Sequence, residues 1–358
     1  MPNRYETLQD ILAHGYDTVI DVRSPAEFAE DHIPGAINLP VLSNEERAEV
    51  GTIYVQESPF KARKLGAALV FRNAANSIEH SLSHHDGGWR PLVYCWRGGQ
   101  RSGSFSWMLS QIGWRAALVE GGYQSYRRLV YGYLYEQTLP FRLIALDGYT
   151  GSAKTELLQR VRALGGQVLD LEGLANHRGS LLGGMAQPQP CQKGFESALA
   201  QELLGMDPAR PVLVEAESSK VGERIIPPSL WRAMKQASRI EVQAPVGARC
   251  RYLSQAYDDI LSDSEKLREK LGYLRGHRAN AVIDHWFDLI NAGNKAALTL
   301  ALMQDHYDPA YQKSRRVNGA DTVADLDLGQ MREADLDRVA QQICDLLQAP
   351  GSPPASGA

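Results

Sequence analysis

The segment from residue 142 to residue 158 constrains the fold of this chain more than any other. A short apolar run, 142–146, leads directly into a glycine-rich turn, Gly148–Thr155, and a helical pattern follows the turn. Such a turn between a buried strand and a helix is typical of a parallel sheet with helices on its faces. Further apolar runs, suited to the other strands, lie at 167–171, 211–215 and 239–243. We therefore predict an α/β domain that starts near residue 140.

The first part of the chain shows the same alternation. Apolar runs at 17–22, 91–94 and 117–119 alternate with helical patterns at 26–31 and 102–112. Strands that alternate with helices indicate βαβ units, because a parallel strand needs a crossover connection. The first part is therefore predicted to form a parallel-sheet domain of its own.

These patterns divide the chain into two domains and a tail. A length of 358 residues exceeds what one ordinary core organises. We predict a first domain over 1–135 and a second over 140–350, whose residues from about 245 onward form a helical extension with charged faces. The last residues, 351–358, are rich in Pro, Gly, Ser and Ala, and we expect them to be disordered.

Composition excludes several classes of protein. Hydrophobic residues make up 44% and charged residues 22% of the chain, which argues against a disordered or fibrous protein. No apolar stretch approaches the roughly 20 residues that span a bilayer, and the first residues lack a signal-peptide pattern. We therefore expect a cytoplasmic protein without a membrane partner. The 4 cysteines make no disulfide scaffold, and no CxxC pair offers a zinc site.

Cys95 stands in the segment whose residue types point most clearly to chemistry. It directly follows a predicted strand, and Arg97, Gly98, Gly99 and Arg101 come after it, before a helical pattern. Successive N–H groups in a glycine-containing loop at a helix N-terminus form a cradle for negative charge. With two guanidinium groups nearby, this cradle favours a nucleophilic thiolate and would also hold an oxyanion. We predict Cys95, Arg97 and Arg101 as catalytic residues, with Gly98 and Gly99 binding phosphate. The alternative is a buried structural cysteine.

The glycine-rich turn at 148–155 has the composition of a Walker A loop. Its backbone N–H groups would surround phosphate oxygens, Lys154 would neutralise a terminal phosphate, and Thr155 could reach a magnesium ion. Ala153 stands where the pattern has its second glycine, and its methyl group restricts close backbone approach. This favours a diphosphate over a tightly bound triphosphate. The predicted phosphate-binding residues are Gly148, Gly151, Ser152, Lys154 and Thr155.

An acidic strand end is a candidate for a second magnesium ligand. The apolar run 211–215 ends in Glu215, and Glu217 follows two residues later. Folds with a phosphate loop hold magnesium with an acid at such a strand end, usually aspartate. A purely structural role for both glutamates is equally plausible from the sequence. For the second domain as a whole, the alternative function is that of a nucleotide kinase.

Two segments of the first domain together resemble rhodanese domains. Residues 21–28 and 31–40, Asp-Val-Arg-Ser-Pro-Ala-Glu-Phe and Asp-His-Ile-Pro-Gly-Ala-Ile-Asn-Leu-Pro, are similar to the N-terminal rhodanese signature, and residues 95–102 are similar to the active-site loop. The resemblance covers about residues 5–135. Common rhodaneses place the arginine five residues after the cysteine, whereas Cys95 and Arg101 are six apart, as in dual-specificity phosphatases of the cell-cycle type. A phosphatase is therefore an alternative, although no general acid for its leaving group is evident.

Nearly the whole chain resembles tRNA 2-selenouridine synthases, which join a rhodanese-like domain to a P-loop domain in this order. Besides the two loops, the matching segments are 169–173, 176–180, 192–196, 215–222 and 306–311. The resemblance implies a transferase that geranylates 2-thiouridine at wobble position 34 of tRNA with geranyl diphosphate and then replaces the S-geranyl group with selenium from selenophosphate. It implies no tightly bound cofactor. The implied partners are tRNAs for Lys, Glu and Gln and a selenophosphate-producing enzyme.

The resemblance also implies a different function for each of the two loops. Cys95 would carry the selenium, with Arg97, Arg101 and the loop amides on the donor phosphate. Lys154 and Thr155 would hold the diphosphate of the geranyl donor. A rhodanese-like sulfurtransferase or a phosphatase with a regulatory nucleotide-binding domain stays the alternative, and the oligomeric state is left open.

A basic run between residues 220 and 251 is the candidate surface for tRNA. Seven Lys or Arg lie there against two acids, although the net charge of the chain is −4. Contacts to phosphates supply salt-dependent affinity without sequence choice. For any single residue, a solvated helix face is the more common alternative. The candidate residues are Lys220, Arg224, Arg232, Lys235, Arg249 and Arg251.

Overall fold

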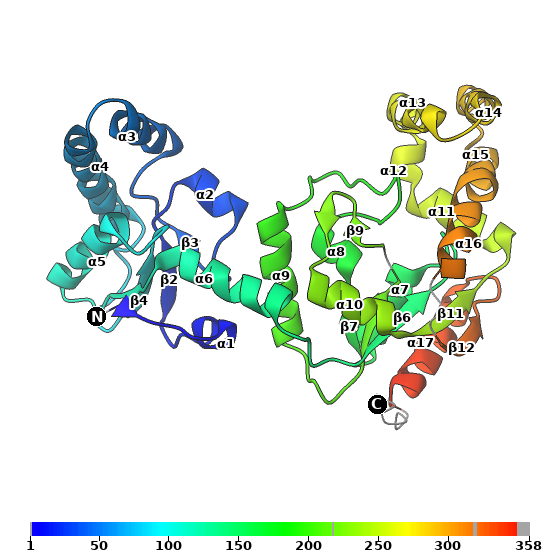
Figure 1. Ribbon diagram of the computed structural model, residues 1–358, viewed down its shortest axis with the longest axis horizontal. Helices are drawn as coiled ribbons and strands as arrows, with labels where there is room; N and C mark the ends of the chain where they lie inside the picture. Colours follow the sequence, from blue (N-terminus) through cyan, green and yellow to red (C-terminus); the bar gives the residue numbers. More distant parts are fainter. Residues whose placement is uncertain (1, 217, 318–320, 349–358) are drawn as a thin grey trace. The chain divides into compact units, whose positions relative to one another are not determined.

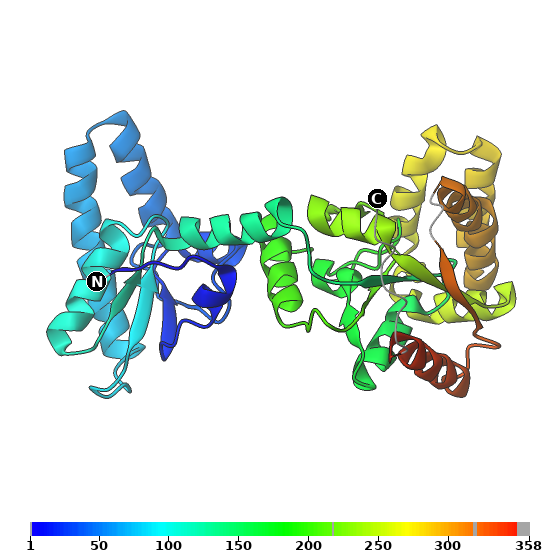
Figure 2. The ribbon, with the colours of Figure 1, turned by 60° about the horizontal axis from the view of Figure 1, so that its bottom comes forward.

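The computed structural model describes residues 2–216, 218–317 and 321–348, the side chains of 314–317 excepted. The chain forms two compact units (Figures 1 and 2). One consists of the residues up to Gln137 together with Pro190–Leu204, and the other of Thr138–Gln189 together with the residues from Gly205 onward. The tail that we expect to be disordered, 351–358, lies outside the described residues.

The first unit is built on a five-stranded sheet with the order β1-β5-β4-β2-β3, in which every pair is parallel. The central strand β4 is buried at all its positions, as expected for a strand covered on both faces. Ile20, Val93 and Phe105 belong to the core beside it. The strands are β1 Pro2–Asn3, β2 Thr18–Asp21, β3 Ile37–Asn38, β4 Pro91–Tyr94 and β5 Ala117–Val119.

Two consecutive helices are among those of the first unit that the sequence pattern does not predict. They are α3, Asn44–Gln56, and α4, Pro59–His80, between β3 and β4. Each begins after a serine, Ser43 or Ser58, whose side-chain oxygen accepts a backbone N–H of the first turn. The other helices are α1 Leu8–Leu12, α2 Pro25–Glu30, α5 Gln100–Ile112, α6 Gly122–Tyr131, the π-helix η1 Gly132–Glu136 and α9 Gln192–Leu204.

Helix α9 packs with the first unit, although the chain before Pro190 and after Leu204 belongs to the second. Its Glu196 is 2% exposed, accepts a hydrogen bond from the Tyr135 hydroxyl at 2.7 Å and forms an ion pair with Arg127. A buried carboxylate is stable only with such partners. The polar residues of α9 therefore bind this helix to the first unit.

The second unit contains another five-stranded parallel sheet, with the order β12-β11-β6-β8-β7. Its core includes Leu146, Leu213 and Val242, together with apolar residues of α7 and α17. The strands are β6 Leu143–Asp147, β7 Gln167–Leu169, β8 Val212–Glu215, β11 Ser238–Gln243 and β12 Thr322–Asp327. The surrounding elements are α7 Lys154–Ala163, α8 Leu171–Ala175, α10 Pro228–Gln236, α17 Glu333–Gln348 and the antiparallel pair β9 Lys220–Val221 and β10 Arg224–Ile225. The predicted α/β class is confirmed in both units.

A helical region separates β11 from β12 and has a core of its own, with Trp286 fully buried inside it. Its elements are α11 Val246–Ala256, α12 Asp258–Leu261, α13 Ser264–Gly272, the 3₁₀-helix η2 Tyr273–Gly276, α14 Asn280–Asn291, α15 Lys295–Leu302, the π-helix η3 Met303–Tyr307 and α16 Asp308–Val317. The predicted helical character is confirmed for this region. It does not extend without interruption, because β12 returns to the sheet and pairs with β11. No helix in the described ranges is both long and apolar enough to cross a bilayer.

Candidate active sites

Cys95 lies where β4 ends, at the start of the loop that leads into α5. The residue is 3% exposed, whereas Arg97 and Gly99 further along the loop are exposed. The Ser102 hydroxyl, one turn into α5, lies 3.1 Å from Cys95 Sγ and donates a hydrogen bond to it. A donor at this distance stabilises negative charge on sulfur. The role of Ser102 has no signature in the sequence beyond its place in the rhodanese-like motif.

The cysteine loop, 95–99, rests on the first residues of α6. Gly98 has φ +67° and Gly122 has φ +60°. A Cβ atom on Gly122 would lie 2.2 Å from the carbonyl oxygen of Cys95 and 2.5 Å from the amide nitrogen of Gly98. Tyr123 N–H donates to the Cys95 carbonyl at 2.8 Å. Only glycine permits this approach of two backbones. The sequence signal for this support is the pair Gly121–Gly122 at the start of α6, which is not among the predicted site residues.

Arg101 is anchored by a carboxylate from α2. Its guanidinium lies 2.8 Å from Glu27 Oε2, and the two side chains are 18% and 20% exposed. Burial opposes ionisation of Glu27, but the hydrogen bond and charge of Arg101, with a backbone hydrogen bond from Ser24, outweigh it and lower the pKa of Glu27. The charge of Arg101 is thus largely compensated. Of the two predicted catalytic arginines, Arg97 is the one whose side chain is exposed to solvent.

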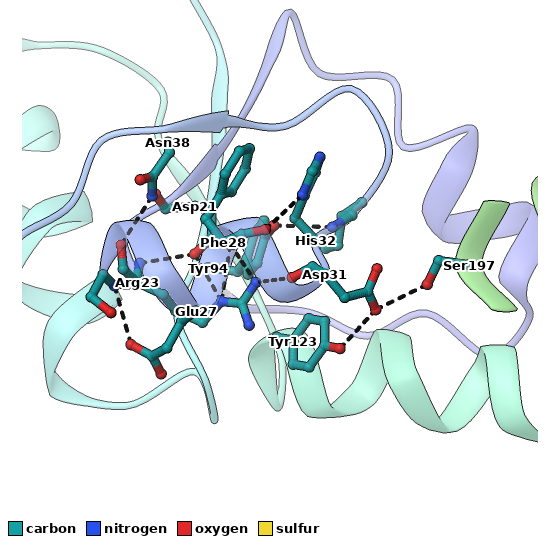
Figure 3. Close-up of polar contacts among 12 residues, drawn as sticks. Asp21, Arg23, Glu27, Phe28, Asp31, His32, Asn38, Tyr94, Tyr123 and Ser197 are labelled. Atoms are coloured by element: carbon teal, nitrogen blue, oxygen red, sulfur yellow. Dashed lines mark hydrogen bonds and ion pairs between the residues drawn. The ribbon is translucent and has the colours of Figure 1, made fainter. Parts of the chain in front are cut away.

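A buried polar network in the same unit joins several elements (Figure 3). Arg23 is 1% exposed and pairs with Asp21 at 2.6 Å, while its Nη2 also donates to the carbonyl of Asp31 at 2.6 Å. The Asp31 carboxylate accepts hydrogen bonds from Tyr123 (2.7 Å) and Ser197 (2.9 Å). Burial raises the pKa of Asp31, although these hydrogen bonds oppose the rise. The network fixes α2, α6 and α9 around the strand ends that carry the cysteine loop.

The phosphate loop, Gly148–Thr155, connects β6 to α7 as predicted. Lys154 Nζ donates to the Gly148 carbonyl at 3.0 Å, so its ammonium group is held at the loop. Ala153 has φ 51° and ψ 33°, the left-handed conformation that glycine adopts easily. An alanine there costs about 1–2 kcal/mol. The loop therefore keeps its turn despite the extra methyl group.

Two carboxylates lie near the start of α7 and α8. Thr155 Oγ1 donates to Glu172 Oε2 at 2.8 Å. Glu215 at the end of β8 is fully buried, and its Oε2 accepts the backbone N–H of Leu171 at 2.8 Å, which supports the start of α8. Glu217 lies outside the described residues. Glu172 belongs to the segment 169–173, where no pattern distinguishes it as a partner of Thr155.

The remaining predicted loop residues have structural constraints as well. Ser152 is 1% exposed and donates to the Tyr149 carbonyl at 2.7 Å. Gly151 has φ +85°, and a Cβ atom there would lie 2.7 Å from Leu253 of α11. No group of three or more His, Cys, Asp or Glu in the described part of the chain is placed to hold a metal ion.

Arg249 does not belong to a tRNA surface, and that prediction is corrected. The residue is 3% exposed, its guanidinium pairs with Asp308 at 2.8 Å, and Nη1 donates to the Thr150 carbonyl at 3.1 Å. A buried, paired guanidinium cannot neutralise a phosphate on an RNA backbone. Arg249 instead ties α11 to the phosphate loop.

Removing the partner of Arg249 should destabilise the second unit strongly. Asp308→Ala leaves a buried guanidinium without its counter-ion, and we expect the free energy of unfolding to fall by about 3 kcal/mol. Urea unfolding followed by tryptophan fluorescence measures this loss. The control is Asp259→Ala, which removes the 53% exposed partner of Arg178 and should cost about 0–1 kcal/mol. Equal losses in the two variants would show that the Arg249 pair is not a buried structural pair.

The other basic residues of the predicted tRNA surface occupy four elements. Lys220 is exposed on β9, Arg224 is half-buried on β10, and Arg232 and Lys235 are exposed on α10. Arg251 is exposed on α11, where it donates to Gln330 at 2.9 Å. Their role in RNA binding stays a prediction.

Comparison with known proteins covers both units. Residues 5–129 match the family model of the rhodanese-like domain, and residues 141–281 match that of the tRNA 2-selenouridine synthase AAA domain. A tRNA 2-selenouridine synthase of Nitrosomonas europaea is 37% identical over 67% of this chain, and one of Nitrosomonas eutropha is 38% identical over 64%. These matches span 63% and 60% of the relatives' own length. One of Hahella chejuensis is 33% identical over 83% of this chain and 86% of its own length.

Proposed function

This chain belongs to the tRNA 2-selenouridine synthase family, and from that premise we propose that it converts 2-thiouridine in tRNA to 2-selenouridine. The observation that carries the proposal is the loop at Cys95. It combines a cysteine at a strand end, a hydroxyl that donates to its sulfur and an exposed rim with Arg97. This is the combination that a thiolate nucleophile acting on a small anion needs.

The first step that we propose is alkylation of the base at the phosphate loop. The sulfur of 2-thiouridine attacks the first carbon of geranyl diphosphate, a C–S bond forms, and the C–O bond to diphosphate breaks. Negative charge grows on the leaving diphosphate, so fixed N–H groups and the Lys154 ammonium group lower the barrier. The Thr155 hydroxyl and the Glu172 carboxylate, whose oxygens lie 2.8 Å apart, are the kind of oxygen ligands that magnesium binds. Such an ion would neutralise part of the leaving charge.

The second step that we propose takes place at the cysteine loop. Selenophosphate is a tetrahedral anion, and the loop amides with Arg97 would hold its phosphate oxygens. Selenium in selenophosphate is at the selenide level, so Cys95 takes up the phosphoryl group and not the selenium. The thiolate attacks phosphorus, a P–S bond forms, the P–Se bond breaks, and selenide leaves. The selenide attacks the base, where a C–Se bond forms and the C–S bond breaks with release of geranylthiol, and water then releases phosphate from Cys95. Arg101 acts as a positioning residue, because its guanidinium is held by Glu27.

The proposed partners follow from these substrates. The tRNA substrates are those for Lys, Glu and Gln by family resemblance, and an enzyme that makes selenophosphate must supply the donor. Lys220, Arg232, Lys235 and Arg251 are the exposed basic residues that we propose for tRNA contacts.

The function is tested by the nucleosides of a strain that lacks the gene. Mass spectrometry of its tRNA is expected to show loss of 2-selenouridine and retention of 2-thiouridine, because the sulfur is the group that this enzyme would replace. The wild-type gene should restore 2-selenouridine, and a gene with Cys95→Ser should not. Persistence of 2-selenouridine in the deletion strain would refute the proposal. Hydrolysis of an aryl phosphate that depends on Cys95 would instead favour the phosphatase alternative.

A further inference from the structure

An apolar pocket lies beside the phosphate loop of the second unit. Its volume is about 330 Å³ when the open solvent at its mouth is included. The wall includes Thr150 of the loop and seven residues of the helical region, among them Leu253, Leu302 and Met303. Such a mostly apolar lining is typical of sites that hold the apolar part of a small molecule.

The pocket and the phosphate loop share α11. Leu253 lies in the pocket wall and also occupies the space where a side chain on Gly151 would be, 2.7 Å from the position of its Cβ. One turn earlier on α11, Arg249 donates to the carbonyl of Thr150, which lines the pocket as well. A molecule whose phosphates lie on the loop thus has the pocket directly beside it.

Several polar groups of the wall already have partners. The Ser180 and Tyr257 hydroxyls lie 3.3 Å apart within hydrogen-bonding distance. Thr299 Oγ1 donates to the Lys295 carbonyl at 2.8 Å and accepts from Ser254 at 3.3 Å. A nucleobase buried here would lose hydrogen bonds to water without gaining equivalent ones, whereas a hydrocarbon chain would lose none. The wall therefore favours an apolar ligand over a nucleotide.

We propose that this pocket binds the isoprenoid chain of the diphosphate donor while the phosphate loop binds its diphosphate. The inference rests on the proposed function, from which it takes the geranyl group. Burial of the chain adds affinity in proportion to its apolar area. Leu302 in the pocket wall then limits the length of chain that the protein accepts.

Leu302 is the position that tests the proposal, and Leu298 is its matched control. Both leucines are on α15 and are 3% and 2% exposed, but only Leu302 lines the pocket. Calorimetry with the full chain measures binding of inorganic diphosphate, dimethylallyl diphosphate, geranyl diphosphate and farnesyl diphosphate. The wild-type protein is expected to bind geranyl diphosphate roughly 100-fold more tightly than dimethylallyl diphosphate, because one more isoprene unit is buried.

The two substitutions at position 302 should change chain length selection in opposite directions. Leu302→Phe fills the pocket and is expected to weaken geranyl diphosphate binding about 10-fold, with inorganic diphosphate unchanged. Leu302→Ala lengthens the pocket and should shift the preference toward farnesyl diphosphate about 10-fold, whereas Leu298→Ala should not. If one variant does not fold, the other still decides.

The pocket and the function can fail separately. Equal binding of inorganic and geranyl diphosphate by the wild-type protein, or equal effects of Leu302→Ala and Leu298→Ala, would overturn the pocket even if the deletion strain lacks 2-selenouridine. Chain selection that depends on residue 302 would support the pocket even if the strain keeps 2-selenouridine.

Discussion

Cys95→Ser is expected to lower the rate of selenation of S-geranylated tRNA by about 10³-fold or more, as losses of a catalytic nucleophile do. Serine fits the same space beneath the loop, and the Ser102 hydroxyl can still donate to it. A serine hydroxyl is not ionised near neutral pH and is a far weaker nucleophile than a thiolate. Selenation should therefore fail without a change in fold. Single-turnover reactions with tRNA that is already geranylated, followed by mass spectrometry of nucleosides, measure this step alone.

Geranylation is the internal control for the cysteine variant. We propose that geranylation depends on the phosphate loop of the other unit, so its rate should stay within about twofold of the wild-type rate. Cys344→Ser is the matched control, since Cys344 is also a buried cysteine, 3% exposed, but lies in the core of the second unit. It should leave both reactions intact. Unchanged selenation in the Cys95 variant would remove the cysteine from the mechanism.

Lys154→Ala should produce the opposite pattern. Loss of the ammonium group removes a fixed positive charge from the leaving diphosphate, and we expect geranyl transfer to slow by about 10²–10³-fold. Selenation of tRNA that is already geranylated should continue at the wild-type rate. The measurement is the rate of S-geranylation of 2-thiouridine-containing tRNA with geranyl diphosphate.

An exposed lysine of the same unit provides the control for Lys154. Lys266→Ala removes a side chain that is 64% exposed and lies 3.8 Å from Asp263, and it should change neither rate. If Lys154→Ala abolished selenation and spared geranylation, the assignment of the diphosphate to this loop would be wrong. If Lys154→Ala lowered the rate of selenation of geranylated tRNA as much as the rate of geranylation, the two loops would not act in separate steps.

Both loops can be predicted from local patterns because their geometry comes from neighbouring residues. A strand, two glycines and a helix start are enough to predict where Cys95 lies, and the same holds for Lys154. The conformation of Ala153 shows the limit of such patterns. The motif departs from glycine there, yet the loop adopts the left-handed turn because the strand and helix on either side impose it.

The amino-acid sequence by itself therefore determined the α/β class, the two loops and the family resemblance, since these depend on periodicity and on residues close together in the chain. Only the tertiary structure decided which charged side chains are free to contact a ligand and which are held in ion pairs. Arg101 is held by Glu27, 74 residues away, and Arg249 by Asp308, 59 residues away. It also decided that α9 packs with the first unit. A buried charge takes whichever partner the packed chain brings within hydrogen-bonding distance, and no local pattern encodes that choice.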